Sequence, residues 1–404
     1  MIGSLISVRT LLLAIFVLMA GSGFLSTLIA IRLEQAGAGD FLIGLVATSY
    51  FGGLTLGAFK VAGIIARVGH IRAFAAFVSI YSASSLTYAV IDAPAVWTLL
   101  RFVDGFVMSG VFVCLESWLN RVARPSNRSG ILAAYMIALY AGQAIGQFLL
   151  NLQDNAPALP FMVSAILLSL AVLPVVLTQI DQPVLEDVEP FSLKRLYAAS
   201  PLGIIGTLAT GMMLGAFYAL GAVFAQRVGL PLSQVALFTS CVIAGGVLLQ
   251  YPLGLLSDKF DRRRVIIAAM AFTAGLGVAL ALSSQPAIIF LSGALFGGFA
   301  FALYPLCVAH SNDHLEESER VGASSGLVLV YSVGAMFGPQ VGSASMGWFG
   351  PSGLFGAIAV MAALGALFGI WRTIIRKPVA SEDQQEFRPL PRTTPMASVL
   401  EDEG

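Results

Sequence analysis

The sequence predicts an all-α membrane protein with twelve transmembrane helices, arranged as two parallel six-helix repeats with both termini in the cytoplasm. The first observation behind this prediction is composition. Of the 404 residues, 57% are hydrophobic and only 11% are charged, and the mean hydropathy is +0.87. Soluble domains carry about 25% charged residues, because their surfaces must be solvated by water. We therefore expect the lipid bilayer to be the solvent of this chain.

The second observation is the number of long apolar segments. A helix needs about 20 mainly apolar residues to cross about 30 Å of hydrocarbon. The first such segment is longer than the core of a signal peptide and lacks a small-x-small cleavage site, so we expect it to remain as a span. The predicted spans are residues 10–33, 41–66, 72–91, 95–119, 129–151, 158–180, 201–226, 231–256, 265–284, 287–310, 322–345 and 352–375.

The third observation is the distribution of the 22 Lys and Arg residues. With twelve spans, nearly all of them fall in loops on one side, whereas Arg32 and Arg227 fall on the other side, and Lys60 and Arg101 lie inside spans. Cytoplasmic loops are enriched in Lys and Arg, which predicts cytoplasmic termini in a multi-pass inner-membrane protein. The formal net charge of +0 gives no indication of a nucleic-acid partner.

The polar segments divide the chain into four parts. We expect an N-terminal six-helix bundle (1–180), a cytoplasmic linker (181–200), a C-terminal six-helix bundle (201–376) and a disordered cytoplasmic tail (377–404), which lacks apolar periodicity. A shift of 192 residues places Arg128 on Arg320 and Gly142 on Gly334. Parallel repeats of this kind are related by an axis along the membrane normal, so we expect a cavity between them near the bilayer midplane.

The loop between the eighth and ninth spans carries the most specific motif. Its sequence GLLSDKFDRR resembles the signature G-x-L-x-D-[RK]-x-G-[RK]-[RK] of the major facilitator superfamily, with Asp261 in place of the second glycine. The counterpart between the second and third spans keeps Arg67 and Gly69 but has Ala66 in place of the acid. The resemblance implies a cytoplasmic gate formed by Arg67, Gly69, Gly254, Asp258, Lys259, Arg262 and Arg263.

Further motifs extend the resemblance over essentially the whole chain. Arg101 to Gly105 resembles the R-x-x-x-G signature, and the segment GQAIGQ beginning at Gly142 resembles the antiporter motif G-P-x-x-G-G. The segment GAMFGP beginning at Gly334 is its counterpart in the second repeat. We expect Gly142, Gly146, Gly334, Gly338 and Pro339 to serve helix packing.

Short segments also resemble the poorly characterised bacterial YcaD-like branch of the superfamily. They are Ser49 to Phe51, Glu116-Ser117, Leu132 to Tyr135, Gln250 to Pro252 and Leu303 to Pro305.

Charged residues within spans are the main candidates for chemistry, because a charge at a helix centre costs about 2.5 to 3.5 kcal/mol unless it is paired or hydrated. Lys60 is close enough to the headgroups to extend its amine to them. Arg101 and Asp104 are helical neighbours: they either form a structural pair, or Arg101 faces the cavity and controls proton binding at Asp104, which is the role we favour. Glu116 is either a second proton site or a partner of the loop residues Arg121 and Arg124.

Neutral polar residues within spans are candidates for the lining of the cavity, although many such residues only hold helices together. We select Tyr50, Gln143, Gln147, Gln250 and Tyr251.

The sequence gives no indication of a metal site, a cofactor or an enzyme. Cys114, Cys241 and Cys307 are far apart in sequence, so we expect free thiols. His310 and His314 share a helix face with Asp313, but polar residues at a helix end usually contact water, so we expect no metal there.

The resemblance and the repeat together predict a secondary active transporter of a small organic molecule that works by alternating access. We favour proton-coupled export by a monomer whose other partners are protons and lipid. A proton-coupled nutrient importer and an uncoupled uniporter remain alternatives, and a receptor or lipid scramblase is a more remote one.

Overall fold

The computed structural model describes residues 2–123, 127–154, 156–177, 192–375, 384–385, 387 and 392–394. Within this part of the chain, twelve helices are long and apolar enough to cross a membrane, which confirms the predicted number of spans. No strand occurs among these residues. The elements are α1 (Ile2–Ser22), α2 (Leu25–Gln35), α3 (Asp40–Val68), α4 (His70–Val90), α5 (Pro94–Val122), α6 (Arg128–Gly146), the 3₁₀ helix η1 (Gln147–Asp154), α7 (Leu159–Val176), α8 (Leu193–Ala199), α9 (Pro201–Arg227), α10 (Leu232–Lys259), α11 (Arg262–Leu282), α12 (Pro286–Asn312), α13 (Glu317–Phe349) and α14 (Ser352–Ile375).

Two spans are less regular than the sequence predicts. The first is divided into α1 and α2 by a turn at Gly23 and Phe24. The fifth changes at Gln147 from α6 into η1, a tighter helix with poorer hydrogen-bond geometry. Both breaks lie beside the interface between the halves, where irregular backbone can be buried in protein rather than exposed to lipid.

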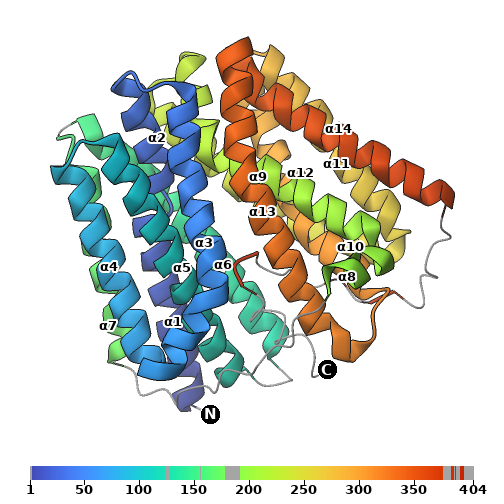
Figure 1. Ribbon diagram of the computed structural model, residues 1–404, viewed down its shortest axis with the longest axis horizontal. Coiled ribbons are helices and arrows are strands. Elements are labelled where there is room, and N and C mark those ends of the chain that lie inside the picture. The colour runs from blue at the N-terminus through green and yellow to red at the C-terminus, as the bar shows by residue number, and fades with distance from the viewer. Residues whose placement is uncertain are drawn as a thin grey trace.

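The helices form two bundles, α1 to α7 and α9 to α14 (Figure 1). The short helix α8 lies in the expected linker, of which residues 181–191 are outside the described residues. Arg195 of α8 forms an ion pair with Glu319 at the start of α13. A capping box between Glu316 and Glu319 begins α13 five residues earlier than predicted.

Glycines at equivalent positions bring helices into close contact in both bundles. A Cβ added to Gly53 of α3 would collide with the carbonyl oxygen of Phe102 on α5, and one added to Gly105 would collide with that of Tyr50. The same crossing joins α10 and α12, where Gly245 lies against Ala294. Gly245 follows Gly53 by the predicted repeat offset of 192, so the two bundles repeat the same close helix crossing.

The predicted packing glycines show the same equivalence. A Cβ on Gly142 would meet the carbonyl oxygen of Phe16 on α1, and a Cβ on Gly334 would meet that of Leu208 on α9. Gly146 lies in the same way against Ala20, Gly338 lies against Met212, and Pro339 follows within α13. Phe16 and Leu208 again differ by 192 positions. Small residues therefore let α6 and α13 approach the first helix of their own bundle.

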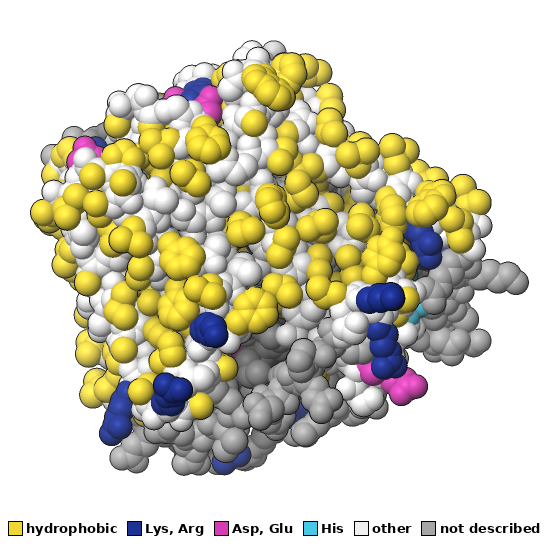
Figure 2. Space-filling model, viewed as in Figure 1, with side chains coloured by type: hydrophobic (Ala, Val, Ile, Leu, Met, Phe, Trp, Pro, Cys, Tyr) yellow, Lys and Arg dark blue, Asp and Glu magenta, His cyan; other side chains and the backbone are white. Residues whose placement is uncertain are grey.

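The outer surface is suited to lipid. Hydrophobic side chains cover the flank of both bundles in Figure 2, and Lys and Arg gather along its lower rim. Large apolar side chains are exposed on helix faces, for example Leu99, Phe59 and Leu364. We name the rim that carries Arg67, Arg72, Arg121, Lys259, Arg264, Arg320 and Arg372 the basic face, and the rim that carries Arg32 and Arg227 the opposite face.

The two bundles meet near the opposite face and diverge toward the basic face (Figure 1). Arg227 at the end of α9 pairs with Glu34 and with Asp40 of the other bundle, each at 2.6 Å. Deeper in the interface, Thr48 donates a hydrogen bond of 3.0 Å to the carbonyl oxygen of Met336. The opposite face is therefore closed by contacts between the bundles.

Candidate functional site

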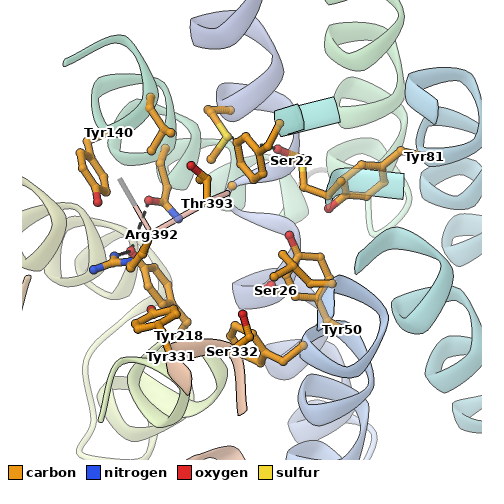
Figure 3. A pocket seen from close by; sticks show the side chains of 18 residues that line it. Ser22, Ser26, Tyr50, Tyr81, Tyr140, Tyr218, Tyr331, Ser332, Arg392 and Thr393 are labelled. Atoms are coloured by element: carbon orange, nitrogen blue, oxygen red, sulfur yellow. Dashed lines mark hydrogen bonds between the residues drawn. The ribbon is translucent and has the colours of Figure 1, made fainter. Parts of the chain in front are cut away.

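A cavity of about 130 Å³ lies between the two bundles (Figure 3). Its walls come from α1 to α6 of the first bundle, from α9 and α13 of the second, and from two residues of the tail. The lining residues are Met19, Ser22, Gly23, Ser26, Tyr50, Phe51, Leu54, Tyr81, Met108, Phe112, Leu139, Tyr140, Gln143, Tyr218, Tyr331, Ser332, Arg392 and Thr393. The chamber is mainly apolar, with hydroxyl, amide and guanidinium groups from both bundles, as small-molecule sites commonly are.

Arg101 lies directly behind the wall of this cavity. Its guanidinium is buried, donates a hydrogen bond of 2.5 Å to Ser26 Oγ, and stands 4.1 Å from the centre of the Tyr50 ring. Both partners line the cavity. An occupant of the chamber that moved either side chain would therefore change the surroundings of Arg101.

Asp104 is the acid that accompanies Arg101. It is fully buried, and its Oδ2 lies 3.8 Å from Arg101 Nη1 and accepts a hydrogen bond of 2.7 Å from Tyr88 of α4. Tyr88 is itself fixed by stacking on Phe161 and by edge contact with Trp97. The structure thus places the two charges together, as the sequence predicts for helical neighbours, and adds a tyrosine partner.

Glu116 lies on the same helix, nearer the basic face, and is also buried. Tyr135 of α6 donates a hydrogen bond of 2.6 Å to its Oε1. The hydroxyls of Thr393 and Thr394 in the tail donate to its two carboxylate oxygens. The carboxylate therefore faces the space between the bundles; Arg121, one of the predicted partners, is exposed, and Arg124 lies outside the described residues.

The predicted gate loop forms a compact charge cluster. The buried guanidinium of Arg262 donates two hydrogen bonds to Asp313, at 2.7 and 2.8 Å, and one of 2.8 Å to Asp258. Burial raises the pKa of Asp313 above its usual value, although the charge of Arg262 partly offsets this effect. Asp313, which follows α12, thus pairs with Arg262. No group of three or more metal-ligating side chains occurs among the described residues.

The tail completes this cluster. The carbonyl oxygen of Gln385 accepts from Arg262 at 2.6 Å, and the backbone NH of Gln385 donates to Asp313 at 2.9 Å. The backbone NH of Phe387 donates to Asp258 at 2.9 Å, and its ring packs on the space that a Cβ of Gly254 would fill. Gln385 and Phe387, for which the sequence predicts no secondary structure, are therefore bound to residues of the gate signature and to Asp313.

The other gate residues lie around the same rim. Arg263 pairs with Asp261 at 2.8 Å, while Lys259 ends α10 and is exposed. Partial burial opposes ionisation of Asp261, but hydrogen bonds and charge from Arg263 hold its pKa below the usual value. In the first bundle, Arg67 is exposed, and Gly69 turns the chain between α3 and α4 at a φ of 85°, a value that favours glycine.

The predicted cavity residues are placed differently from one another. Tyr50 and Gln143 line the cavity. Gln147 is buried near it, donates to the carbonyl oxygen of Gly23 at 3.1 Å and accepts from Thr239 of the other bundle at 3.3 Å. Gln250 is buried outside the lining, and Tyr251 is 61% exposed on the outer surface of α10.

The sequence does not single out several residues that the structure brings to this site. Ser26, Tyr81 and Tyr88 surround the Arg101 and Asp104 pair. The only indication of them in the sequence is that they are polar residues within apolar helices. Arg392 and Thr393 reach the cavity from the tail. Nothing in a polar, unperiodic tail predicts that it returns to the interior.

Sequence comparison identifies the family. The Major Facilitator Superfamily sequence model matches residues 11–246 and 202–400. The chain belongs to this superfamily. It resembles the YcaD branch: the uncharacterized MFS-type transporter YcaD of Salmonella enteritidis PT4 is 29% identical over 358 residues, which cover 87% of this chain and 92% of that protein. This chain is accordingly a multi-pass membrane transporter.

Solved structures share the superfamily fold. A bacterial homologue of the human lysosomal transporter Spinster, in an inward-facing and occupied conformation, superposes with a TM-score of 0.76 at 14% identity and covers 94% of this chain and 97% of its own. The nucleoside transporter NupG superposes with a TM-score of 0.74 at 13% identity and covers 91% of this chain and 98% of its own. At identities this low, the likeness establishes the fold alone.

Proposed function

We propose that this superfamily member is a proton-coupled secondary transporter that exports a small organic molecule across the bacterial inner membrane by alternating access. The observation that carries the proposal is the contact between the cavity and a buried ionisable pair. Ser26 and Tyr50 line the cavity and touch Arg101, which pairs with Asp104. Substrate in the cavity and a proton on Asp104 would therefore act on the same guanidinium.

Coupling between substrate and proton depends on Arg101, because this guanidinium contacts both the cavity wall and Asp104. Asp104 lies in an apolar interior, where an ionised carboxylate is stable only while a cation stays beside it. Substrate in the cavity that pushes Arg101 toward Asp104 strengthens that support and favours release of the proton from Asp104. Conversely, a proton on Asp104 releases Arg101 toward the cavity and disfavours bound substrate, which is the reciprocal competition that export driven by proton entry requires.

Two observations support export as the direction of transport. The bundles are joined at the opposite face and diverge at the basic face, which the distribution of Lys and Arg predicts to be cytoplasmic. This conformation would load from the cytoplasm. The antiporter-like segment that begins at Gly142, which packs α6 on α1, also favours export.

The test uses purified protein in liposomes that contain a pH-sensitive dye. Substrates are first selected by thermal shift, because a ligand of the native state raises the unfolding temperature. We expect substrate addition to move protons in the wild type, and Asp104→Asn to abolish this movement while exchange of labelled substrate continues. Proton-driven movement that persists in both Asp104→Asn and Glu116→Gln would refute the assigned sites, and equilibration independent of the gradient would identify a uniporter.

A further inference from the structure

The guanidinium of Arg392 lies in a cage of aromatic rings between the bundles. Its central carbon is 4.3 Å from the ring centre of Phe301 and 5.7 to 5.9 Å from those of Tyr140, Tyr218 and Tyr331. Tyr218 also accepts a hydrogen bond of 2.9 Å from Arg392 Nη2. Figure 3 shows Arg392 between Tyr140 on one side and Tyr218 and Tyr331 on the other. Ring faces within about 6 Å attract a cation through their quadrupoles.

The cage is built by the helices rather than by the tail. Tyr140 comes from α6 of the first bundle, while Tyr218, Phe301 and Tyr331 come from α9, α12 and α13 of the second. The rings hold one another, since Phe301 lies 5.6 Å from Tyr140 and 6.0 Å from Tyr218. A cage whose rings pack against each other needs little reorganisation to receive a cation.

Charge near the cage also suits a cation. Among the described residues, Arg392 forms no ion pair. In the cage its guanidinium faces aromatic rings and donates a hydrogen bond to the Tyr218 hydroxyl. The next two residues of the tail, Thr393 and Thr394, donate hydrogen bonds to the carboxylate of Glu116 on α5. An acid at the edge of an aromatic cage adds long-range attraction for a positive ligand.

The neighbouring cavity indicates what accompanies the charge. Arg392 and Thr393 form part of its lining, and Leu54, Phe112 and Leu139 contribute apolar walls. Its volume is about 130 Å³. An apolar cavity of about 150 Å³ is large enough to hold benzene. With the space that the Arg392 side chain would vacate, the chamber accommodates a cationic group joined to one ring-sized apolar group.

We propose that the four-ring cage is the recognition site for a small organic cation of the guanidinium or amine class, and that Arg392 occupies it as an internal competitor. This inference rests on the proposed function, because it names the substrate class of the same central chamber. The tail is covalently linked to the bundle, so its effective concentration at the cage is on the order of millimolar. Substrate must displace Arg392 to bind.

Binding of a matched pair of probes tests the charge requirement. Benzylguanidinium carries the cation and an apolar ring, and N-benzylurea has nearly the same shape without the charge. Isothermal titration calorimetry on purified full-length protein in detergent measures both. We expect benzylguanidinium to bind at least about tenfold more tightly than N-benzylurea, as several ring contacts of 0.5 to 1 kcal/mol would give. Affinities within about threefold of each other overturn the proposal.

Arg392→Gln tests the competition. If the tail fills the cage nine-tenths of the time, removing its charge raises the affinity for benzylguanidinium about tenfold, because apparent affinity scales with the free fraction of the site. Arg388→Gln removes the same charge from the same tail and serves as the matched control. The competition is contradicted if Arg392→Gln leaves the affinity for benzylguanidinium unchanged. It is also contradicted if Arg388→Gln raises that affinity as much as Arg392→Gln does.

The cage itself is tested in the Arg392→Gln background, where the tail no longer competes. We expect Phe301→Leu to weaken benzylguanidinium binding about threefold to thirtyfold and N-benzylurea binding little. Phe272→Leu is the control, because Phe272 is 58% exposed and stacks on Phe299. Tyr331→Leu replaces Phe301→Leu if the latter does not elute as a folded monodisperse species. Equal loss for both probes would indicate lost packing only and overturn the cage.

These measurements are independent of transport. Charge-selective binding, with no proton movement for any compound selected by thermal shift, would leave the cage intact and refute the proposed function. Proton-coupled movement of neutral compounds without charge-selective binding would do the reverse.

Discussion

Arg227→Gln probes the closure of the opposite face. Arg227 donates to Glu34 through two nitrogens, at 2.7 and 2.6 Å, and also pairs with Asp40 at 2.6 Å. All three side chains are between 20% and 23% exposed. Exposed pairs contribute about 0.2 to 1 kcal/mol, whereas hydrogen bonds to charged groups contribute about 1.5 to 3 kcal/mol. This partly buried network therefore stabilises closure by about 1.5 to 3 kcal/mol.

That free energy sets the size of the expected effect. A loss of about 1.5 to 3 kcal/mol changes the ratio of closed to open molecules by about 10- to 150-fold. Ser332 lines the cavity and is buried, so a cysteine in its place reports opening. We expect Arg227→Gln to increase the rate at which a membrane-impermeant maleimide, added at the opposite face, alkylates Ser332→Cys in a background without the three native cysteines.

Arg32→Gln is the matched control, because it removes a charge from the same face outside the Arg227 network. Its alkylation rate should stay near that of the parent. The reasoning is refuted if Arg227→Gln leaves the rate unchanged in folded protein, or if Arg32→Gln raises it as much. The first outcome would mean that apolar contacts between α3 and α13 carry the closure.

Two further substitutions test buried and surface charges. Tyr88→Phe removes a donor to buried Asp104 and should lower the free energy of unfolding by about 1 to 3 kcal/mol, seen as a lower melting temperature in detergent, whereas exposed Tyr197→Phe should change it little. Asp261→Asn removes a carboxylate whose pKa is held below its usual value by Arg263. The ionised carboxylate stabilises the fold by up to about 1 kcal/mol. This stabilisation is fully present above the unfolded-state pKa of about 4 and is lost as the pH falls through the lower folded-state pKa. The melting temperatures of variant and wild type should differ at pH 7 and converge below pH 4; a constant difference would contradict this.

Much of the fold could be predicted because the bilayer imposes strong rules. Each span must satisfy its own backbone hydrogen bonds, so long apolar segments mark the helices almost one by one. The 192-residue offset also proved structural, since Gly53 and Gly245 meet carbonyl oxygens at equivalent crossings. The break at Gly23 was not predicted, because glycine within an apolar segment is as often a packing residue as a turn.

The site was less predictable because its partners are distant in sequence. Helical spacing predicts that Arg101 and Asp104 are neighbours, and they are. Spacing cannot predict that Arg262 binds Asp313, 51 positions away, or that rings from α6, α9, α12 and α13 share one cage. Such contacts depend on how helices pack and rotate, which a hydropathy pattern does not specify.

The tail connects features that the sequence divides between the halves. The first bundle holds Asp104 and Glu116, whereas the better gate signature, with Asp258 and Arg262, belongs to the second. Phe387 binds at that signature, and a few residues later Thr393 donates to Glu116. A movement of the bundles that separates these anchor points must therefore break contacts of the tail with one of them. Release of the tail and rearrangement of the two halves are thus coupled, and a ligand that displaces Arg392 from its cage would favour both.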